Sequence, residues 1–476
     1  MPGTENTLVE QLVEEMRGGI ATRTLTPGTR LPSIRAQAAA HGVSKTTVVE
    51  AYDRLTAVGI IESRRGSGFY VARHPPPLSL ANAGVRLDRE VDPLWVSRQS
   101  LETPDDALKP GCGWLPPSWM PEDSLRRALR GLARSEIVAL TDYGSPLGLA
   151  PLREHLARRL AGFGVAAAPG QILLTESGTQ AVDLLCRFLL EPGDTVLVDD
   201  PCYFNFRALL RAHRAQVVSV PYTPTGPDLA AFAEVLAAHQ PRLYITNAAV
   251  HNPTGASLSA LTAHRLLKLA EQHDLTIIED DIFADFEAEP SPRLASFDGL
   301  ERVVQIGSFS KTLSASLRCG YIAARADWIE GLTDLKIATS FAGGRLSAEL
   351  LLAVLQGGTY RKHMEGLRTK LAGAMSHASA QLRAVGLTPW VEPHAGMFLW
   401  CELPEGLDAA AIARQALTEN LVLAPGNVFS PAQTARSFLR FNVSQCADPR
   451  IFEVLRRSLG AGRAKPQAPS GCSERT

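Results

Sequence analysis

The sequence predicts a multidomain protein: a small helical head with a β wing, then an α/β body with a smaller α+β part at its C-terminal end. Two observations predict this. Residues 1–74 show three helical patterns followed by a short hairpin pattern. From residue 111 onward, continuous apolar runs of strand length alternate with helical patterns, which is typical of a largely parallel sheet buried on both faces. We therefore expect domains over 1–74 and 111–462, joined by a linker over 75–110.

Length and composition limit what the chain can be. A chain of 476 residues is too long for one ordinary core, and its 45% hydrophobic and 20% charged residues are globular values. Its net charge of −1 excludes a basic field over the whole protein, so any contact with nucleic acid must be local. Seven cysteines without metal-ligand spacing indicate reduced thiols in a cytoplasmic protein and no metal site. No apolar run reaches about 18 residues, so no membrane span is expected.

The head begins with three predicted helices. Apolar residues at helical spacing predict the first over residues 5–20. Ser33 is placed to cap a second helix that runs to Ala40, and Ser44 to cap a third over 45–58. Residues 60–71 then predict a hairpin with a basic, glycine-containing tip.

This order favours a winged helix-turn-helix. The third helix would enter the DNA major groove through its first turn, formed by Ser44, Lys45, Thr46 and Thr47. Three arginines would contact phosphates, which fix the register without reading the sequence: Arg35, Arg64 and Arg65. Residues 1–74 hold nine Lys or Arg against seven Asp or Glu, so the case depends on clustering on one face. The alternative is a small helical protein-binding module.

The head closely resembles the GntR family of bacterial regulators. The matching segments cover nearly its whole length: Arg30-Leu31-Pro32-Ser33-x-Arg35, Val43-Ser44-x-x-Thr47-Val48, Ala51-Tyr52-x-x-Leu55, Gly59 and Gly66-Ser67-Gly68-Phe69-Tyr70-Val71. The resemblance implies a winged helix-turn-helix that binds a double-stranded DNA operator. After it, Pro75-Pro76-Pro77 favours an extended connector, and the weak polar pattern up to about residue 109 predicts a partly disordered linker.

Seven apolar runs of strand length predict the sheet of the body. They are Ile172–Leu174, Val196–Val198, Val217–Val220, Leu243–Ile245, Thr276–Ile278, Val303–Ile306 and Tyr321–Ala323. Helical patterns over 180–190, 228–238 and 259–272 lie between strands. In such sheets ligands bind at the loops beyond the strand ends. The large part of the body is expected over about 140–330 and the small part over about 331–462.

A lysine flanked by small hydroxyl residues follows one of these strands. Lys311 lies in Ser308-Phe309-Ser310-Lys311, and Arg318 comes seven residues later. An amine of this kind forms a Schiff base with an aldehyde cofactor, while the two serines and Arg318 are placed to hold a phosphate. For such a short motif taken alone, the alternative is a solvated lysine in a polar loop.

Four further loops at strand ends carry matching groups. Gly178, Thr179 and Gln180 open a helix, where free amides and the helix dipole suit a phosphate. Tyr203 can stack on a flat ring, and Asn252 can bond a phenolic oxygen. A carboxylate at Asp280 would keep a pyridine nitrogen protonated. The alternatives are turn chemistry, a core or surface tyrosine, and strand-end solvation.

Together these groups are what one ligand needs, a phosphate on a flat pyridine that bears an aldehyde, which is pyridoxal 5'-phosphate. Their order and spacing resemble the fold type I aminotransferases, the aspartate aminotransferase superfamily, from residue 111 to about 460. The resemblance implies a transferase fold of that type with Lys311 as the Schiff-base lysine and Asp280 at the pyridine nitrogen. It further implies Asn252 at the ring oxygen, Tyr203 on the ring, and around the phosphate Gly178, Thr179, Ser308, Ser310 and Arg318. Gln180, at the same helix start as Gly178, is also expected to bind the cofactor.

The same resemblance implies a homodimer that binds an amino acid. Tyr143 lies in a segment whose tyrosine would reach the phosphate of the neighbouring subunit. Arg440, within the expected strand Ser437–Asn442, would hold an α-carboxylate bidentately. The alternative for Arg440 is an edge-strand arginine in solvent. Residues 463–476 are polar and are expected to form a disordered tail.

One residue departs from the aminotransferase pattern. Many relatives carry a tyrosine three residues after the pyridine-binding aspartate, whereas Asp280 is followed there by Phe283, which has no hydroxyl. Cofactor binding is expected to survive, because Lys311, Asp280 and the phosphate shell remain. The donor that would tune the cofactor for transamination is missing.

A GntR-like head, a linker and an aminotransferase-like body together resemble the MocR subfamily of regulators. This implies a transcriptional regulator that senses pyridoxal 5'-phosphate, or an amine such as an amino acid, through its body. A ligand changes DNA binding only by its differential affinity for two arrangements of the dimer. The alternatives are a catalytically active aminotransferase with an attached regulatory DNA-binding domain, and a non-catalytic cofactor reservoir.

Overall fold

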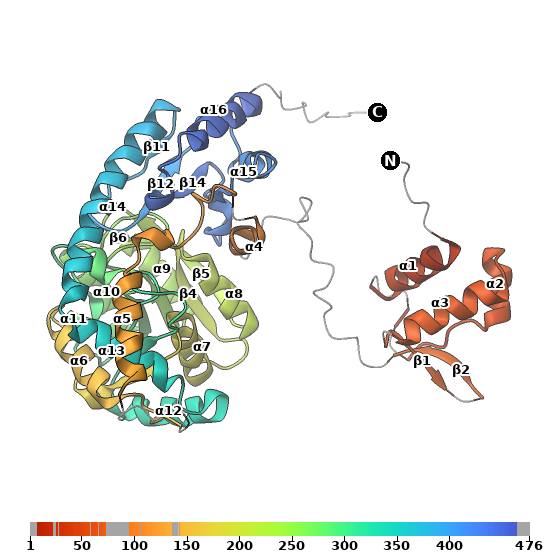
Figure 1. Ribbon diagram of the computed structural model, residues 1–476, viewed down its shortest axis with the longest axis horizontal. Helices are drawn as coiled ribbons and strands as arrows, with labels where there is room; N and C mark the ends of the chain where they lie inside the picture. Colours follow the sequence, from red (N-terminus) through yellow and green to blue (C-terminus); the bar gives the residue numbers. More distant parts are fainter. Residues whose placement is uncertain are drawn as a thin grey trace. The chain divides into compact units, whose positions relative to one another are not determined.

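The computed structural model describes residues 7–21, 25–26, 28–57, 59–64, 66–72, 95–104, 106–135, 141 and 143–463. The chain divides into two compact units, Met1–Arg86 and Leu87–Thr476, which we call the head and the body and describe separately (Figure 1). Among the described helices, none combines the length and the apolar character that crossing a membrane requires.

The head contains three helices and a two-stranded hairpin, in the predicted order. They are α1 (Leu8–Ala21), α2 (Ile34–His41), α3 (Lys45–Ala57), β1 (Ile61–Arg64) and β2 (Gly68–Val71). Ser33 caps α2 by accepting a hydrogen bond from the Ala36 amide at 3.2 Å. Gly42 ends that helix with a φ of 62°, a conformation that glycine adopts without strain. Local capping thus sets the turn between α2 and α3.

The apolar faces of these elements form one core. Val48 and Leu55 of α3 pack with Met16 of α1 and Val71 of β2. Tyr52 lies among them, and its hydroxyl donates to the Pro32 carbonyl oxygen at 2.9 Å. Val48 of the first turn of α3 points into this core, whereas Lys45 and Thr46 of the same turn are exposed.

The body is built on an eight-stranded sheet with the order β3-β10-β9-β8-β7-β4-β5-β6. The strands are β3 (Ile172–Thr175), β4 (Thr195–Asp200), β5 (Gln216–Thr223), β6 (Gly226–Pro227), β7 (Leu243–Thr246), β8 (Thr276–Asp280), β9 (Val303–Ser308) and β10 (Gly320–Ala323). β5, β4, β7, β8 and β9 pair in parallel, whereas β10 is antiparallel to both of its neighbours. The predicted, largely parallel sheet is confirmed.

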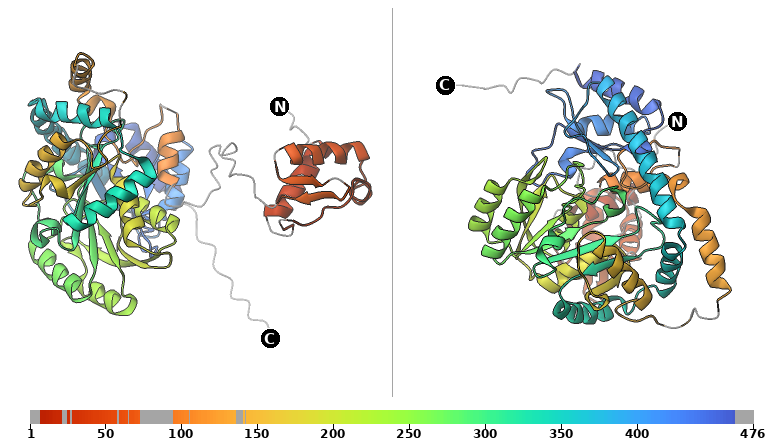
Figure 2. Two further views of the ribbon diagram at one scale, coloured as in Figure 1. Left: turned by 90° about the horizontal axis from the view of Figure 1, so that it is seen from below. Right: turned by 90° about the vertical axis from the view of Figure 1, so that its left-hand side faces the viewer.

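Helices cover both faces of this sheet (Figure 2). Val304 and Ile306 of β9 pack in a cluster with α7, α8 and α12, while the neighbouring Val303 packs in another cluster with α6, α9 and α10. The helices are α6 (Ala150–Ala161), α7 (Gly178–Leu189), α8 (Phe204–Ala212), α9 (Leu229–His239), α10 (Ala260–Gln272) and α12 (Ala326–Ser340). Successive strand residues point to opposite faces, so burial of both faces requires the continuous apolar runs seen in the sequence.

A smaller antiparallel sheet has the order β11-β12-β14-β13. Its strands are β11 (Thr388–Pro389), β12 (Phe398–Glu402), β13 (Ala424–Pro425) and β14 (Phe438–Asn442), and two helices belong to the same part of the chain, α15 (Ala409–Leu417) and α16 (Arg450–Arg463). The long helix α14 (Thr359–Ala384) runs along one side of the body, from the level of the large sheet to that of the small sheet (Figure 1).

The small part begins later in the chain than expected. Helix α12 packs on α7 and β3, and α13 (Arg345–Gln356) packs on α6 and α5 (Glu122–Ala133), so both belong with the large sheet. The boundary therefore lies at α14 and not near residue 331. The remaining elements are short: α11 (Leu294–Asp298) and the 3-10 turns η2 (Pro117–Trp119), η3 (Pro169–Gln171), η4 (Ala284–Phe286), η5 (Gly426–Val428) and η6 (Val443–Gln445).

The C-terminal half of the expected linker also belongs to the body. Helix α4 (Trp95–Glu102) buries Trp95 and Val96 in the main core, and Leu108 pairs with Leu421 beside the small sheet. A few buried anchors hold this segment, too few to show as a periodic pattern in a polar stretch. The linker expected over 75–110 is therefore too long at its C-terminal end. Residues 75–94, and residues 464–476 of the expected tail, lie outside the described residues.

Candidate functional site

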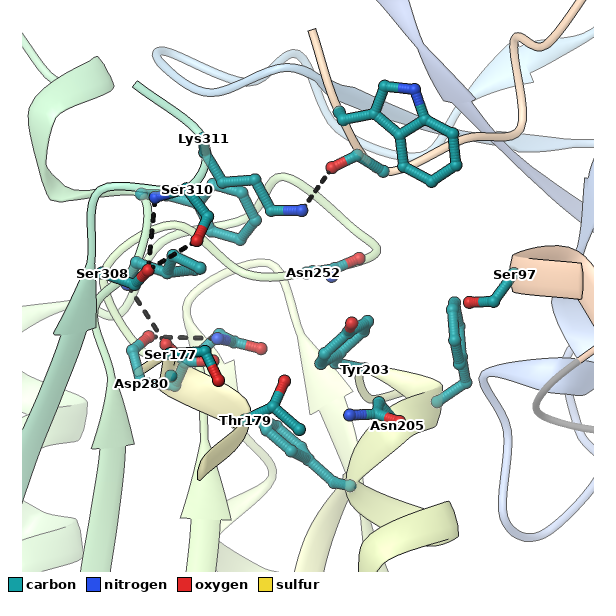
Figure 3. Close-up of a pocket in the computed structure, with 18 of the residues that line it drawn as sticks. Ser97, Ser177, Thr179, Tyr203, Asn205, Asn252, Asp280, Ser308, Ser310 and Lys311 are labelled. Carbon is teal, nitrogen blue, oxygen red and sulfur yellow. Dashed lines mark hydrogen bonds between the residues drawn. The ribbon is translucent and has the colours of Figure 1, made fainter. Parts of the chain in front are cut away.

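A cavity opens at the carboxyl ends of the parallel strands of the body (Figure 3). Residues of the large sheet, the small sheet and α4 line it together. Ten residues singled out from the sequence meet there: Gly178, Thr179, Tyr203, Asn252, Asp280, Ser308, Ser310, Lys311, Arg318 and Arg440. The strands explain this convergence, because parallel strands direct their carboxyl ends to one edge of the sheet. Asp280 ends β8 and Ser308 ends β9, while Gly178 opens the helix that follows β3.

Lys311 is half-buried, with its amine at the cavity wall. Its Nζ donates to the Gly113 carbonyl oxygen at 2.6 Å (Figure 3). A Cβ added to Gly113 would lie 3.8 Å from Nζ, at ordinary contact distance, so the amine and this glycine are direct neighbours. Burial, together with the nearby Arg440 guanidinium, lowers the pKa of Lys311 from its usual 10.5 to about 8. More of the amine is therefore neutral, and nucleophilic, than in an exposed lysine.

Asp280 supplies a buried carboxyl group. Its Oδ1 accepts from the Ile282 amide at 3.2 Å, and the Asn247 side chain donates to its backbone oxygen at 3.0 Å. Burial raises the pKa of Asp280 to about 6. Asn247 Oδ1 is buried and has no hydrogen-bond partner among the described residues. This corner of the cavity is thus short of a cationic or hydrogen-bond-donating partner.

Hydroxyl groups and a helix N-terminus form a cradle beside Asp280. Ser308 Oγ lies 2.8 Å from Ser310 Oγ and accepts from the Ser310 amide at 3.2 Å (Figure 3). Gly178 and Thr179 form the first turn of α7, and Arg318 lines the same region. Free amides at a helix start, hydroxyl donors and a guanidinium together favour a phosphate group.

Two expected cofactor residues do not line this cavity. Gln180 Oε1 accepts from the Glu176 amide at 2.6 Å, and its Nε2 donates to Ser340 Oγ at 3.4 Å, so its side chain stabilises the start of α7. The expected contribution of Gln180 to cofactor binding stays a prediction. The Tyr143 side chain is 81% exposed and stacks on Phe341, with ring centroids 5.3 Å apart. Its expected contact with a neighbouring subunit stays a prediction.

Arg440 is buried among neutral partners. It belongs to β14, which lies between β12 and β13, so it is not an exposed edge-strand residue. Its guanidinium donates to Asn252 Oδ1 at 2.9 Å and to the Gly111 carbonyl oxygen at 2.8 Å, while Nε has no partner among the described residues. Burial lowers the pKa of Arg440 to about 10. A desolvated guanidinium with only neutral partners is suited to an anionic ligand such as a carboxylate.

Several lining residues were not found from the sequence. They are mainly polar: Ser97, Ser100, Ser177, Asn205 and Asn247. Asn247 directly follows β7 and Ser177 lies two residues beyond β3, and that position is the signal that would have found them. Ser97 and Ser100 lie on α4, within the stretch expected to be linker, where no local pattern marks them.

The predicted DNA-contacting residues of α3 divide into two pairs. Ser44 Oγ accepts from the Thr47 amide at 3.1 Å and bonds the Thr47 hydroxyl at 2.8 Å, so this pair starts the helix. Lys45 and Thr46 are exposed and make no helix-start bond of this kind. Arg35 is exposed on α2.

The hairpin carries one described basic side chain near its tip. Arg64 pairs with Glu62 at 2.6 Å, and its guanidinium lies 4.4 Å from the centre of the Tyr70 ring. These contacts hold the guanidinium at the hairpin surface, and a surface ion pair of this kind is weak enough to exchange for a phosphate. Arg65 lies outside the described residues.

Comparison with known proteins gives two family matches. Residues 8–71 match the bacterial regulatory proteins of the gntR family, and residues 118–457 match aminotransferase class I and II. The chain is 31% identical over 446 residues to the HTH-type transcriptional regulator YdcR of Escherichia coli K12, covering 91% of this chain and 94% of that protein. It is 26% identical over 441 residues to the HTH-type transcriptional regulator NorG of Staphylococcus aureus USA300, covering 89% of this chain and 98% of that protein.

Two solved structures show the same fold in the body. LysN, an α-aminoadipate aminotransferase of Thermus thermophilus complexed with N-(5'-phosphopyridoxyl)-L-leucine, is 27% identical with a TM-score of 0.71, covering 81% of this chain and 100% of that one. Kynurenine aminotransferase of Pyrococcus horikoshii is 22% identical with a TM-score of 0.72, covering 82% of this chain and 99% of that one. The chain therefore belongs to the aminotransferase class I and II family and carries a GntR-type head, the domain order of the MocR subfamily.

Proposed function

We propose that this protein is a cytoplasmic transcriptional regulator that binds an operator through its head and senses pyridoxal 5'-phosphate, or an amine that reacts with it, through its body. One observation carries the proposal: Lys311, Asp280 and the serine cradle converge in one cavity of a chain that also has a GntR-type head. Homologues that match about nine-tenths of the chain are named transcriptional regulators, which supports regulation over metabolism.

The cavity residues fit pyridoxal 5'-phosphate. Asp280, beside the unpartnered Asn247 Oδ1, would hold the pyridine nitrogen, and Tyr203 would cover the ring. Asn252 would bond the ring oxygen. The phosphate would lie in the cradle made by Gly178, Thr179, Ser308, Ser310 and Arg318. When bound, the cofactor supplies an aldehyde that condenses with primary amines and a ring that withdraws electrons.

The protein groups prepare this chemistry. Lys311 offers an amine whose pKa of about 8 leaves roughly a tenth of it neutral at pH 7, far more than in an exposed lysine. Asp280 would hold a proton at the pyridine nitrogen, since a buried carboxylate is stabilised by an adjacent cation. Arg440 would orient an amino acid by its carboxylate, with the Phe398 ring 4.2 Å from the guanidinium excluding water.

Arg440 also favours a second candidate function, aminotransferase activity. Against it stands Phe283, which lines the cavity and brings an apolar ring where a hydroxyl donor would tune the ring oxygen. Repeated production of keto acid from an amino donor would establish catalysis. We expect instead a change in the cofactor spectrum and in operator binding, without turnover.

We predict that Lys311→Ala abolishes the visible absorbance of lysine-bound cofactor in the purified protein, because no other amine is expected to lie at the aldehyde. The measurement is an absorption spectrum after addition of pyridoxal 5'-phosphate and removal of the excess. Lys362→Ala, which changes an exposed lysine of α14, is the matched control and should keep the absorbance. An unchanged spectrum in Lys311→Ala would refute the assignment.

We further propose a homodimer in which Tyr143 reaches the phosphate of the second copy. Its support is the 81% exposed Tyr143 ring stacked on Phe341, itself 62% exposed. In the head, Lys45 and Thr46 would meet bases together with Ser44 and Thr47, while Arg35, Arg64 and Arg65 would contact phosphates.

A further inference from the structure

Helix α4 forms one wall of the cavity. Val96, Ser97 and Ser100 line it, and the buried Trp95 holds the helix against the main core. Figure 3 shows the Ser97 hydroxyl directed into the cavity, toward the side where Tyr203 and Asn205 lie. None of the groups assigned to the cofactor comes from this helix, so α4 is free to contact another part of a ligand.

Ser100 carries an unmet hydrogen-bonding group at this wall. The residue is 2% exposed, and its Oγ has no partner among the described residues. A buried hydroxyl without a partner costs free energy that a hydrogen-bonding ligand would recover. Ser97 and Asn205 add two further neutral groups that line the cavity.

Charge is absent from this end of the cavity. The lining residues with charged side chains are Asp280, Lys311, Arg318 and Arg440, and each has a role at the cofactor or at the ligand carboxylate. The lining residues of α4 itself, Val96, Ser97 and Ser100, are neutral, and the neutral Asn205 lies on the side of the cavity toward which Ser97 points (Figure 3). A charged ligand group there would lose its hydration without a counter-ion, and an apolar group would leave the Ser100 hydroxyl unpaired.

We propose that the α4 end of the cavity selects an amino acid whose side chain is neutral and hydrogen-bonding, a hydroxyl or a carboxamide, through Ser97, Ser100 and Asn205. This rests on the proposed function, because the amino group of the ligand is assigned to the cofactor and its carboxylate to Arg440. The proposal adds the chemical class of the effector to the site.

The test compares amino acids of matched shape on the full-length protein loaded with pyridoxal 5'-phosphate. L-Threonine is paired with L-valine and L-glutamine with L-methionine, and L-glutamate provides the charged case. Each is titrated while the visible absorbance of the bound cofactor is followed. We expect at least one polar member to bind about fivefold more tightly than its apolar match, the typical net contribution of one hydrogen bond. L-Glutamate should bind more weakly than L-glutamine.

Two variants locate the preference on α4. Ser97→Ala and Ser100→Ala should remove it while keeping the cofactor absorbance, and Ser100→Ala should fold normally because it deletes an unpaired hydroxyl. Leu101→Ala, at a 74% exposed position of the same helix, should keep the preference. Equal affinities within both pairs, or a preference that survives in both serine variants, would overturn this inference alone. A wild-type protein without cofactor absorbance would instead overturn the proposed function, and this inference with it.

Discussion

Burial shifts three charged residues of the cavity toward their neutral forms. The pKa of Lys311 falls to about 8, that of Arg440 falls to about 10, and that of Asp280 rises to about 6. Each change has desolvation as its largest cause, and the hydrogen bonds recorded for the side chains of Lys311, Asp280 and Arg440 are to neutral groups. A ligand that brings a pyridinium nitrogen and a carboxylate would supply partners to Asp280 and Arg440. Asp280 therefore lacks a cationic partner and Arg440 lacks an anionic partner among the described residues, and the proposed ligands carry these charges.

The lowered pKa of Lys311 predicts how cofactor capture depends on pH. Only the neutral amine attacks an aldehyde, so the rate should rise about tenfold per pH unit below pH 8 and level off above it. With an amine of the usual pKa of 10.5, the rate of cofactor capture would keep rising until the pH reached that value. Stopped-flow absorbance on cofactor-free protein from about pH 6 to about pH 10 measures this. A rate that still climbs at pH 10 would show that the amine is not desolvated.

Basic residues of the hairpin tip should act on DNA through charge. Replacing Arg64 and Arg65 together with alanine should weaken binding to all sequences alike and reduce the salt slope by roughly 0.9 per lost phosphate contact. Binding isotherms at several salt concentrations give both quantities. Arg54→Ala is the control, since Arg54 lies near the end of α3 and pairs with Glu50 at 2.6 Å. Unaltered affinity in the double variant would refute the wing assignment.

Helix α14 connects the two loops that carry the central residues of the site. The Tyr360 hydroxyl donates to the Asp285 carboxylate and lies 3.1 Å from Thr312 Oγ1, next to Lys311 in the chain. His363 Nε2 bonds the Thr312 carbonyl oxygen at 2.9 Å. Asp285 lies in η4, shortly after Asp280. A single rigid helix thus holds the lysine loop and the aspartate loop in register.

Removing one hydroxyl from α14 tests that connection. Tyr360→Phe leaves the buried Asp285 carboxylate with one donor fewer, although its ion pair with Arg159 at 2.5 Å remains. We expect the free energy of unfolding to fall by about 1–3 kcal/mol, the cost of an unsatisfied buried acceptor. Denaturant unfolding of the full-length protein measures it. Arg361→Ala, at the exposed neighbouring position, should change it by less than about 0.5 kcal/mol. Equal free energies of unfolding for Tyr360→Phe and the wild type would show that the hydrogen bond from Tyr360 to Asp285 does not stabilise the protein.

At the scale of the whole molecule, the order of the chain places a wall of the cavity at the start of the described part of the body. Helix α4 is the first described element after residues 73–94, and it lines the cavity. The head and the body each have their own core, so any signal between them depends on a ligand that favours one arrangement over another. Regulation is therefore a property of the full chain and not of either unit.

Ligand and operator binding should be coupled in the intact protein. With pyridoxal 5'-phosphate bound, an amino acid that changes the cofactor spectrum should change operator affinity by about 5- to 150-fold, the usual range of coupling between two sites. Fluorescence anisotropy with labelled operator measures this. Lys311→Ala is the matched control, and its operator affinity should not respond. Identical affinities with and without the amino acid in the wild type would exclude sensing through the cofactor.

Much of the molecule follows from local patterns. The apolar runs from Ile172 to Ala323 predict the strands because burial on both faces demands them, and Lys311 with Ser308 and Ser310 marks the cavity because small residues around an amine are a local signal. The order of the head follows likewise from caps and turns such as Ser33 and Gly42.

The tertiary structure alone decided the rest. It joined the Gln180 side chain to Ser340, brought Ser97 and Ser100 into the cavity wall, and moved the small-part boundary to α14. It also buried Arg440 beside Asn252, and placed Lys311 on Gly113, 198 residues away in the sequence. Backbone periodicity and capping act between near neighbours, so a sequence displays them directly. Which distant side chains share a cavity depends on how the finished elements pack, and no local pattern records that.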